Sequence, residues 1–253
     1  MSYLLPCKFL LSDMEWCASV VAAGGDFSEL ASAGYIKVEP LSPEKLEAVR
    51  AEAESRLYNN ESRLQNFADS NEVRLFFDPF LDETADLSCA DLTTTLLDFL
   101  PWLMRLRYAR HRLAMINRLD AREDGEELRF GSGSGWHRDS PIRHQLKFFT
   151  FLTDVGSDTG VLRILKNTHK TSQLGRAHKL IGKPMSEFRY TEEDISILLR
   201  NGFETHEFAC EAGSQFLINT RLIHSGKPLV SGSRLAVTQY LFPNRAQSSS
   251  LLG

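Results

Sequence analysis

Short runs of alternating apolar and polar residues fill the second half of the chain and predict β-strands. Along a strand, successive side chains point to opposite faces, so such a run buries one face and leaves the other polar. Glycine-rich turns separate the runs, a pattern typical of a sandwich or a closed barrel. We predict strands at residues 112–119, 135–139, 144–153, 161–165, 205–210, 214–219 and 234–242.

Apolar residues at helical spacing are concentrated before residue 110. One helix is predicted to begin after Ser42, which suits the N-cap, because Pro43 favours the first turn. Apolar residues then recur on one face at Leu46, Val49, Ala53 and Leu57. A second helix is predicted at 90–107, where Pro101 should kink or divide it.

Two short strands are predicted in the first half, at 31–38 and 72–81. Within the strand-rich half, one helix is predicted at 191–200, where Thr191 caps the N-terminus and acidic residues follow it. Helices that precede a block of strands, instead of alternating with strands, disfavour a doubly wound sheet. The predicted fold is therefore mainly β with flanking α: a jelly roll with N-terminal helices.

The length of 253 residues lies within the range of one sandwich or barrel domain, and 42% hydrophobic residues can bury a sizeable core. The sequence contains no internal repeat and no linker that would divide it. We expect a single domain over residues 1–253, with the helical flank at about 1–110 and the jelly-roll core at about 111–243.

The formal net charge of −4 disfavours nucleic-acid binding, which usually shows as a strongly basic domain. The 4 cysteines are scattered, without the close pairs of a zinc site or a disulfide scaffold, so we expect reduced thiols. Lys8 interrupts the apolar first residues, no cleavage site follows, and no run approaches the about 18 apolar residues of a membrane span. We expect a cytoplasmic protein without stable membrane insertion.

The candidate chemistry centres on His137 and Asp139, in the stretch 135–140. One residue separates them, so on a strand both side chains point to the same side and offer a metal ion one nitrogen and one oxygen. His224, in the stretch 219–226, offers a second imidazole. Two histidines and one carboxylate on one face of iron are the arrangement of non-heme Fe(II) oxygenases. Taken alone, however, the first pair favours a hydrogen-bonded His–Asp pair at a strand end.

Two more features accompany these residues. Arg234 lies in the stretch 231–240, which is typical of the next strand of a hairpin. Between the metal motifs lies the stretch 160–170, with Gly160, Leu162, Thr168 and His169. In this order, the four segments resemble the phytanoyl-CoA dioxygenase family of Fe(II)/2-oxoglutarate oxygenases, and the resemblance covers roughly residues 34–242.

The resemblance implies a double-stranded β-helix in which Fe(II) is bound by His137, Asp139 and His224. Arg234 would pair with the distal carboxylate of 2-oxoglutarate, because its planar fork meets a carboxylate bidentately and stays charged when buried. Weaker candidates for contact with this cosubstrate are Ser225 and Asn117. The implied reaction uses O₂ to hydroxylate an unactivated C–H of a small molecule and releases succinate and CO₂.

The chain departs from the family pattern at Lys166 and Asn167, where Pro-Gly is usual; this affects a local turn and not the metal ligands. The counterpart of His169 is structural in the family. Halogenating relatives replace the metal-binding carboxylate by a small residue, whereas Asp139 is present here, so we expect hydroxylation or another oxidation. No catalytic residue beyond the metal ligands is predicted.

Two other function classes remain open on the residues alone. A jelly roll that binds a ligand without turnover would not need the full set of metal ligands and Arg234. A metal-dependent hydrolase also uses two histidines and a carboxylate, but it would normally need a general base and would leave Arg234 unexplained.

Residues 163–189 form a basic segment with a single acid, Glu187. Such a block is usually a solvated surface. If it lies at the barrel mouth, with Arg143, His144 and Lys166 facing the substrate and Lys147 adding to a positive rim, it would concentrate anionic ligands there. On this interpretation we expect an acidic small molecule that bears phosphate or carboxylate, or one carried on an acidic group such as coenzyme A.

Overall fold

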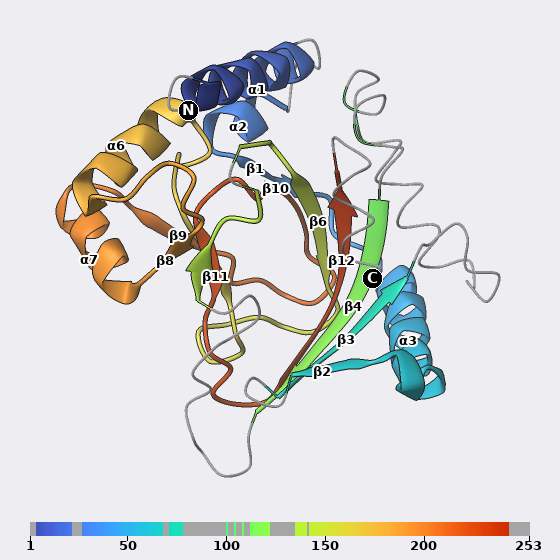
Figure 1. The fold of residues 1–253 in the computed structure, drawn as a ribbon. Helices are drawn as coiled ribbons and strands as arrows, with labels where there is room; N and C mark the ends of the chain where they lie inside the picture. The colour runs from blue at the N-terminus through green and yellow to red at the C-terminus, as the bar shows by residue number, and fades with distance from the viewer. Residues whose placement is uncertain are drawn as a thin grey trace.

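The computed structural model describes residues 4–21, 27–67, 71–77, 100, 104, 108, 112–121, 135–140 and 142–242. These residues form two antiparallel sheets with helices on their outer sides (Figure 1). The predicted jelly roll is confirmed. The helix predicted at 90–107 lies outside the described residues, apart from Leu100 and Met104.

The described residues give the larger sheet seven strands in the order β1-β10-β6-β12-β4-β3-β2. These strands are β1 (Tyr35–Val38), β2 (Gln65–Phe67), β3 (Glu72–Phe77), β4 (Arg112–Asp120), β6 (Leu146–Phe151), β10 (Gln215–Asn219) and β12 (Ser233–Leu241). The smaller sheet has the order β8-β5-β11-β7-β9. Its strands are β5 (Trp136–His137), β7 (Leu162–Leu165), β8 (Arg189–Tyr190), β9 (Thr205–Glu207) and β11 (His224–Gly226).

Each predicted strand range contains a strand of the structure, although β5 covers only two of the five residues predicted at 135–139. Three strands, β2, β8 and β11, were not predicted as strands, because two or three residues are too few to show alternation. Strands β1, β2 and β3 precede residue 110 and still join the larger sheet, so the sheet begins well before the expected core boundary.

The helices cover both sheets from outside. Two of them begin as predicted: α3 (Pro43–Asn59) is capped by Ser42, and α7 (Glu192–Arg200) has a capping box made by Thr191 and Asp194. The remaining helical elements are α1 (Leu4–Val21), α2 (Phe27–Ser32), η1 (Glu61–Arg63) and α6 (Thr171–Ile181). Helix α6 was not predicted; it lies in the basic segment 163–189 and buries Leu174, Ala177 and His178.

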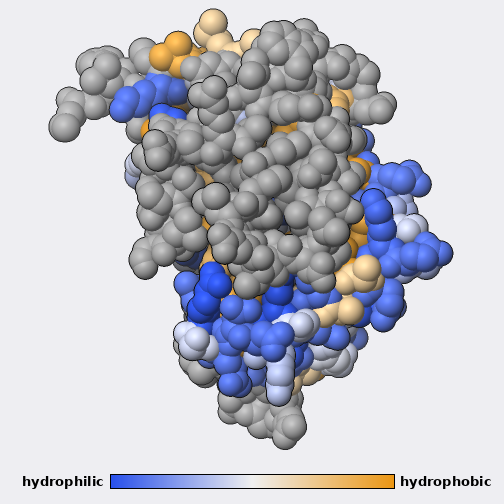
Figure 2. Space-filling view, turned by 90° about the vertical axis from the view of Figure 1, so that its right-hand side faces the viewer, coloured by the Kyte–Doolittle hydropathy of each residue, from blue (hydrophilic) through white to orange (hydrophobic). Residues whose placement is uncertain are grey.

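Each group of helices packs against a different surface. Helices α1 and α2 cover β6 and β10, α3 covers β3 and β4, and α6 and α7 cover the smaller sheet (Figure 1). Figure 2 views the molecule from the right-hand side of Figure 1, where α3 lies, and the described part of this face is mainly hydrophilic. No helix among the described residues is long and apolar enough to span a membrane.

Strand β6 shows how the fold creates an interior. Leu146 and Phe148 point outward into the apolar cluster beneath α1 and α2. The alternate residues Lys147, Phe149 and Phe151 point inward and line a cavity between the sheets. The period of two along one strand therefore separates the core from the candidate site.

Candidate metal centre

Strand pairing brings the two histidines together. His224 on β11 is directly opposite His137 on β5, and the ring centroids are 4.3 Å apart. Asp139 lies just beyond the end of β5, where its backbone N–H donates to the carbonyl of Thr220 at 3.1 Å. The predicted convergence of His137 and Asp139 is therefore present, but a turn anchored to the β10–β11 connection produces it, and not a continuous strand.

Backbone carbonyls fix the orientation of both imidazole rings. His137 Nδ1 lies 2.9 Å from the carbonyl oxygen of Gly135, and His224 Nδ1 lies 2.8 Å from that of Leu222. Because a carbonyl oxygen can only accept, each Nδ1 carries the proton and each Nε2 keeps a free lone pair. Metal-binding histidines are usually held in this way.

Both free nitrogens point at the same carboxylate. His137 Nε2 is 3.6 Å from Asp139 Oδ1, and His224 Nε2 is 3.7 Å from Oδ2. The three side chains offer ligand atoms within 4.8 Å of one another, and no other such group occurs among the described residues. Burial lowers the pKa of His224 to about 3, which keeps its imidazole neutral. This donor set fits a divalent metal ion.

Lys147, predicted from the sequence only as part of a positive rim, lies beside the candidate metal ligands. Its Nζ lies 2.8 Å from Asp139 Oδ2, and its side chain is 11% exposed. Burial alone would raise the pKa of the Asp139 carboxyl, but the charge of Lys147 beside it holds that pKa well below its usual value. Asp139 is therefore ionised and ready to bind a cation.

Arg234 lies on β12 at the other end of the cavity and is 5% exposed. One terminal nitrogen donates to the carbonyl of Gly160, and Nη2 donates to Asn117 Oδ1 at 3.2 Å. Its Nε–H, however, has no partner among the described residues. Burial lowers the pKa of Arg234 to about 10, so the guanidinium remains charged at neutral pH. A buried cation with an unused donor fits a ligand carboxylate.

The neighbours of Arg234 form a buried polar chain. Asn117 Nδ2 donates to Glu72, and Arg74 contacts both oxygens of Glu72, at 2.6 and 2.8 Å. Of the two weaker candidates from the sequence, Asn117 lines the cavity beside Arg234. Ser225 does not line it: between inward-facing His224 and Gly226 it points the other way, and its hydroxyl donates to the Gly226 carbonyl at 3.0 Å.

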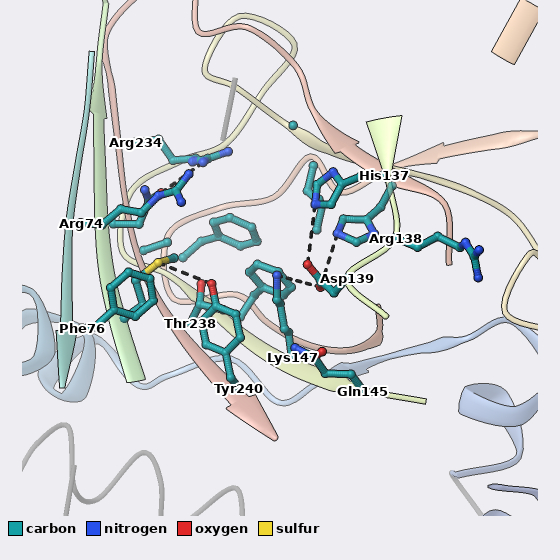
Figure 3. Close-up of a pocket in the computed structure, with 18 of the residues that line it drawn as sticks. Arg74, Phe76, His137, Arg138, Asp139, Gln145, Lys147, Arg234, Thr238 and Tyr240 are labelled. Atoms are coloured by element: carbon teal, nitrogen blue, oxygen red, sulfur yellow. Dashed lines mark hydrogen bonds and ion pairs between the residues drawn. The ribbon is translucent and has the colours of Figure 1, made fainter. Parts of the chain in front are cut away.

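The cavity has a volume of about 430 Å³ and holds the candidate metal ligands and Arg234 in one space (Figure 3). Aromatic rings form much of its wall: Phe76, Phe149, Phe151, Phe188, Tyr240 and Phe242. Asp139 is the only acid among the described lining residues, whereas Arg74, Lys147 and Arg189 add positive charge. The site is thus an apolar chamber with a metal centre and several cations.

The three residues predicted to face the substrate are not among those that line the cavity. His144 is buried beneath α1, where its ring stacks on Trp16 and its Nε2 lies 3.0 Å from Asp13. Lys166 is on the surface and pairs with Glu204 at 2.9 Å. Arg143 is exposed, and its backbone N–H donates to Ser140. The structure does not bring these side chains to the metal centre.

One part of the basic segment does reach the cavity. Residues 183–189, here called the strap segment, contribute Phe188 and Arg189 to its lining. The buried guanidinium of Arg138 holds this segment: it donates to the carbonyls of Met185, at 2.8 Å, and Glu187, at 2.6 Å. Some basic side chains of residues 163–189 pair with acids instead: Arg163 with Glu192, and Lys183 with Asp194.

Fold and site together define a jelly-roll protein with the two-histidine, one-carboxylate centre of a non-heme oxygenase. The model of the family described as phytanoyl-CoA dioxygenase (PhyH) matches residues 30–236. The chain belongs to this family of Fe(II)- and 2-oxoglutarate-dependent oxygenases. No curated protein matches the sequence.

Solved structures resemble the fold at low identity. The non-heme alpha ketoglutarate dependent epimerase SnoN from nogalamycin biosynthesis has 14% identity and a TM-score of 0.59, covering 85% of this chain and 80% of its own. EctD from S. alaskensis with bound Fe has 16% identity and a TM-score of 0.55, covering 85% and 74%. A Pseudomonas putida prolyl-4-hydroxylase has 14% identity and a TM-score of 0.50, covering 85% and 95%.

Proposed function

We propose that the protein is an Fe(II)- and 2-oxoglutarate-dependent dioxygenase that hydroxylates a small anionic metabolite. One observation carries the proposal: a metal-ligand triad and a buried arginine with an unused donor line one cavity. The triad alone also suits a hydrolase. Among the described lining residues, no second acid lies beside the triad to act as the general base that a hydrolase normally uses.

Different residues bind the iron and the 2-oxoglutarate. His137, His224 and Asp139 hold the iron, with the imidazole tautomers fixed by the carbonyls of Gly135 and Leu222. Arg234, supported by Asn117, binds the distal carboxylate of 2-oxoglutarate. The bound iron and 2-oxoglutarate supply the oxidation by O₂, with succinate and CO₂ as co-products. The aromatic wall keeps water away from the reacting C–H.

Asp139 also bears on the outcome of the reaction. Its carboxylate stands between the two histidines, at 3.6 and 3.7 Å, and therefore fills the place that a halide would need. The proposed product is hydroxylated and not halogenated. The positive charge of the cavity lining, to which the strap segment contributes Arg189, supports an anionic substrate. This charge does not come from Arg143, His144 and Lys166, which were predicted to face the substrate.

The test is succinate formation by the purified protein supplied with Fe(II), 2-oxoglutarate and O₂, measured by mass spectrometry. We expect slow turnover without added substrate, and its loss in His224→Ala, which removes one metal ligand. Lys166→Met, which changes a surface residue outside the cavity, is the matched control and should behave like the wild type. Equal succinate formation by His224→Ala and the wild type would contradict the proposal.

A further inference from the structure

Lys147 is a buried cation on the inner face of β6. Its backbone is opposite Tyr240 of β12, and its Nζ lies 4.6 Å from the centre of the Tyr240 ring. Among the described residues, its only acidic partner is Asp139, at 2.8 Å. A lysine side chain that is 11% exposed needs such a partner, because an isolated buried charge is costly.

Asp139, the partner of Lys147, is also a candidate metal ligand, and the inference that follows rests on the proposed function. Asp139 is one of the three residues that would hold iron. A carboxylate shared with a divalent cation balances an ammonium group less well, since the cation draws on the same negative charge and also repels the lysine. When iron is bound, the positive charge of Lys147 is therefore not fully balanced by Asp139.

The distal carboxylate of 2-oxoglutarate, which Arg234 is proposed to bind, does not balance the charge of Lys147 either. Arg234 and Tyr240 are six residues apart on β12, which separates them by roughly 20 Å along the strand. Lys147 is across from Tyr240, so it lies at the other end of this strand pair from Arg234. Figure 3 shows Arg234 and Arg74 on one side of the cavity, and Lys147 and Gln145 on another.

We infer that Lys147 determines substrate specificity by binding a carboxylate of the substrate beside the metal centre. Gln145 and Thr238 present an amide and a hydroxyl to the same region of the cavity and complete a polar pocket for one anionic head. The surrounding Phe76 and Tyr240 suit an apolar body. One lysine with neutral donors matches the single charge of a carboxylate better than the double charge of a phosphate.

The cavity limits the size of this acid. About 430 Å³ must hold 2-oxoglutarate as well as the reacting part of the substrate. The inferred substrate is therefore a small carboxylic acid with an aliphatic or aromatic body, oxidised at a carbon near its carboxylate.

The test compares each acid with its own amide, which keeps shape and removes charge. Protein loaded with Fe(II) and 2-oxoglutarate without oxygen is titrated with 3-phenylpropanoate or 3-phenylpropanamide, and with hexanoate or hexanamide. Perturbation of the visible absorption of the iron–2-oxo acid chelate gives the Kd. We expect the wild type to bind at least one acid about 10-fold or more tightly than its amide, as a buried charge pair should produce.

Lys147→Met and Lys147→Gln should reduce this preference to within about 3-fold, and Lys147→Arg should keep most of it. The control Lys166→Met should match the wild type. Two results would overturn the inference: a wild type without preference for any acid, or a Lys147→Met variant that retains the preference.

A third result would also overturn the inference. If Lys147→Met binds acid and amide equally more weakly, or loses only affinity for 2-oxoglutarate, the lysine positions Asp139 or the cosubstrate and does not select the substrate. A wild-type protein that gives no chelate would instead contradict the proposed function itself.

Discussion

Replacing Arg138 by methionine tests whether one buried guanidinium holds the strap segment over the cavity. Arg138 is 1% exposed and lies between the metal ligands His137 and Asp139. Its Nε donates to the Tyr190 hydroxyl at 2.8 Å, and Nη2 donates to two carbonyls of the strap segment. Methionine fills similar space but donates to none of these acceptors.

The expected loss of stability follows from these three hydrogen bonds. Bonds from a charged donor contribute about 1.5–3 kcal/mol each, and an acceptor left unpaired in a buried place costs a similar amount. The cost of burying the guanidinium itself, several kcal/mol, is relieved in the variant and offsets much of this sum. We therefore expect Arg138→Met to lower the free energy of unfolding by about 2–4 kcal/mol. For a chain of this length, that change lowers Tm by about 5–15 °C.

The assay is thermal unfolding followed by circular dichroism, arranged as a double-mutant cycle with Tyr190→Phe. Because Tyr190 accepts from Arg138 and contacts His178, the two substitutions should be non-additive by about 1 kcal/mol. Arg200→Met is the matched control, since its exposed pair with Glu193, at 3.5 Å, should contribute less than about 1 kcal/mol. An unchanged Tm in Arg138→Met, or strict additivity with Tyr190→Phe, would refute the reasoning.

Three further predictions concern acid stability and the two candidate cosubstrate residues. Burial lowers the pKa of His144 to about 3 and that of His169 to about 4, while the unfolded chain binds protons on both near pH 6.5. The free energy of unfolding should therefore fall as pH drops from about 6.5 to about 4, by about 1.4 kcal/mol per pH unit for each histidine. Urea titrations across this range measure it, and a constant free energy of unfolding would contradict the prediction. Arg234→Leu should weaken 2-oxoglutarate binding by about 2–5 kcal/mol and Fe(II) binding far less, as measured by titration of each; equal losses would indicate a general collapse of the site. Ser225→Ala should leave the KM for 2-oxoglutarate within about 2-fold, because the hydroxyl points away from the cavity, and a large rise in KM would place the serine in the site.

The sequence predicted the elements whose signals are local. Ser42 and Thr191 cap helices because their side chains bond to backbone N–H groups three residues ahead, which is a property of a few adjacent residues. The longer strands, such as β12, alternate over enough residues to be recognised. His137, Asp139 and His224 were found because their spacing resembles a known motif, although the turn that places Asp139 was not foreseen.

The missed residues depend on contacts between distant parts of the chain. Lys147 was predicted only as part of a positive rim, and only the fold shows that it faces Asp139. Arg138 was passed over between two metal ligands, because its partners lie in the strap segment. His144 was considered for substrate contact because it follows the metal motif closely, whereas its imidazole belongs to a cluster beneath α1. Nearness in sequence did not predict nearness to the cavity.

That cluster links the metal centre to a part of the chain outside the family match, which begins at residue 30. Asp13 of α1 accepts from Arg221, a fully buried residue three positions before His224, and from the backbone N–H of Thr171 at 3.2 Å. Burial alone would raise the pKa of the Asp13 carboxyl, but the hydrogen bonds from His144 and Thr171 and the charge of Arg221 keep it below its usual value. Arg221 is the buried partner, and loss of Asp13, whose side chain is 26% exposed, would leave that buried charge without its acid, at a cost of up to about 3–5 kcal/mol. The connection that carries His224 is therefore held in place by α1, so residues 30–236 contain every candidate metal ligand but not every contact that positions them.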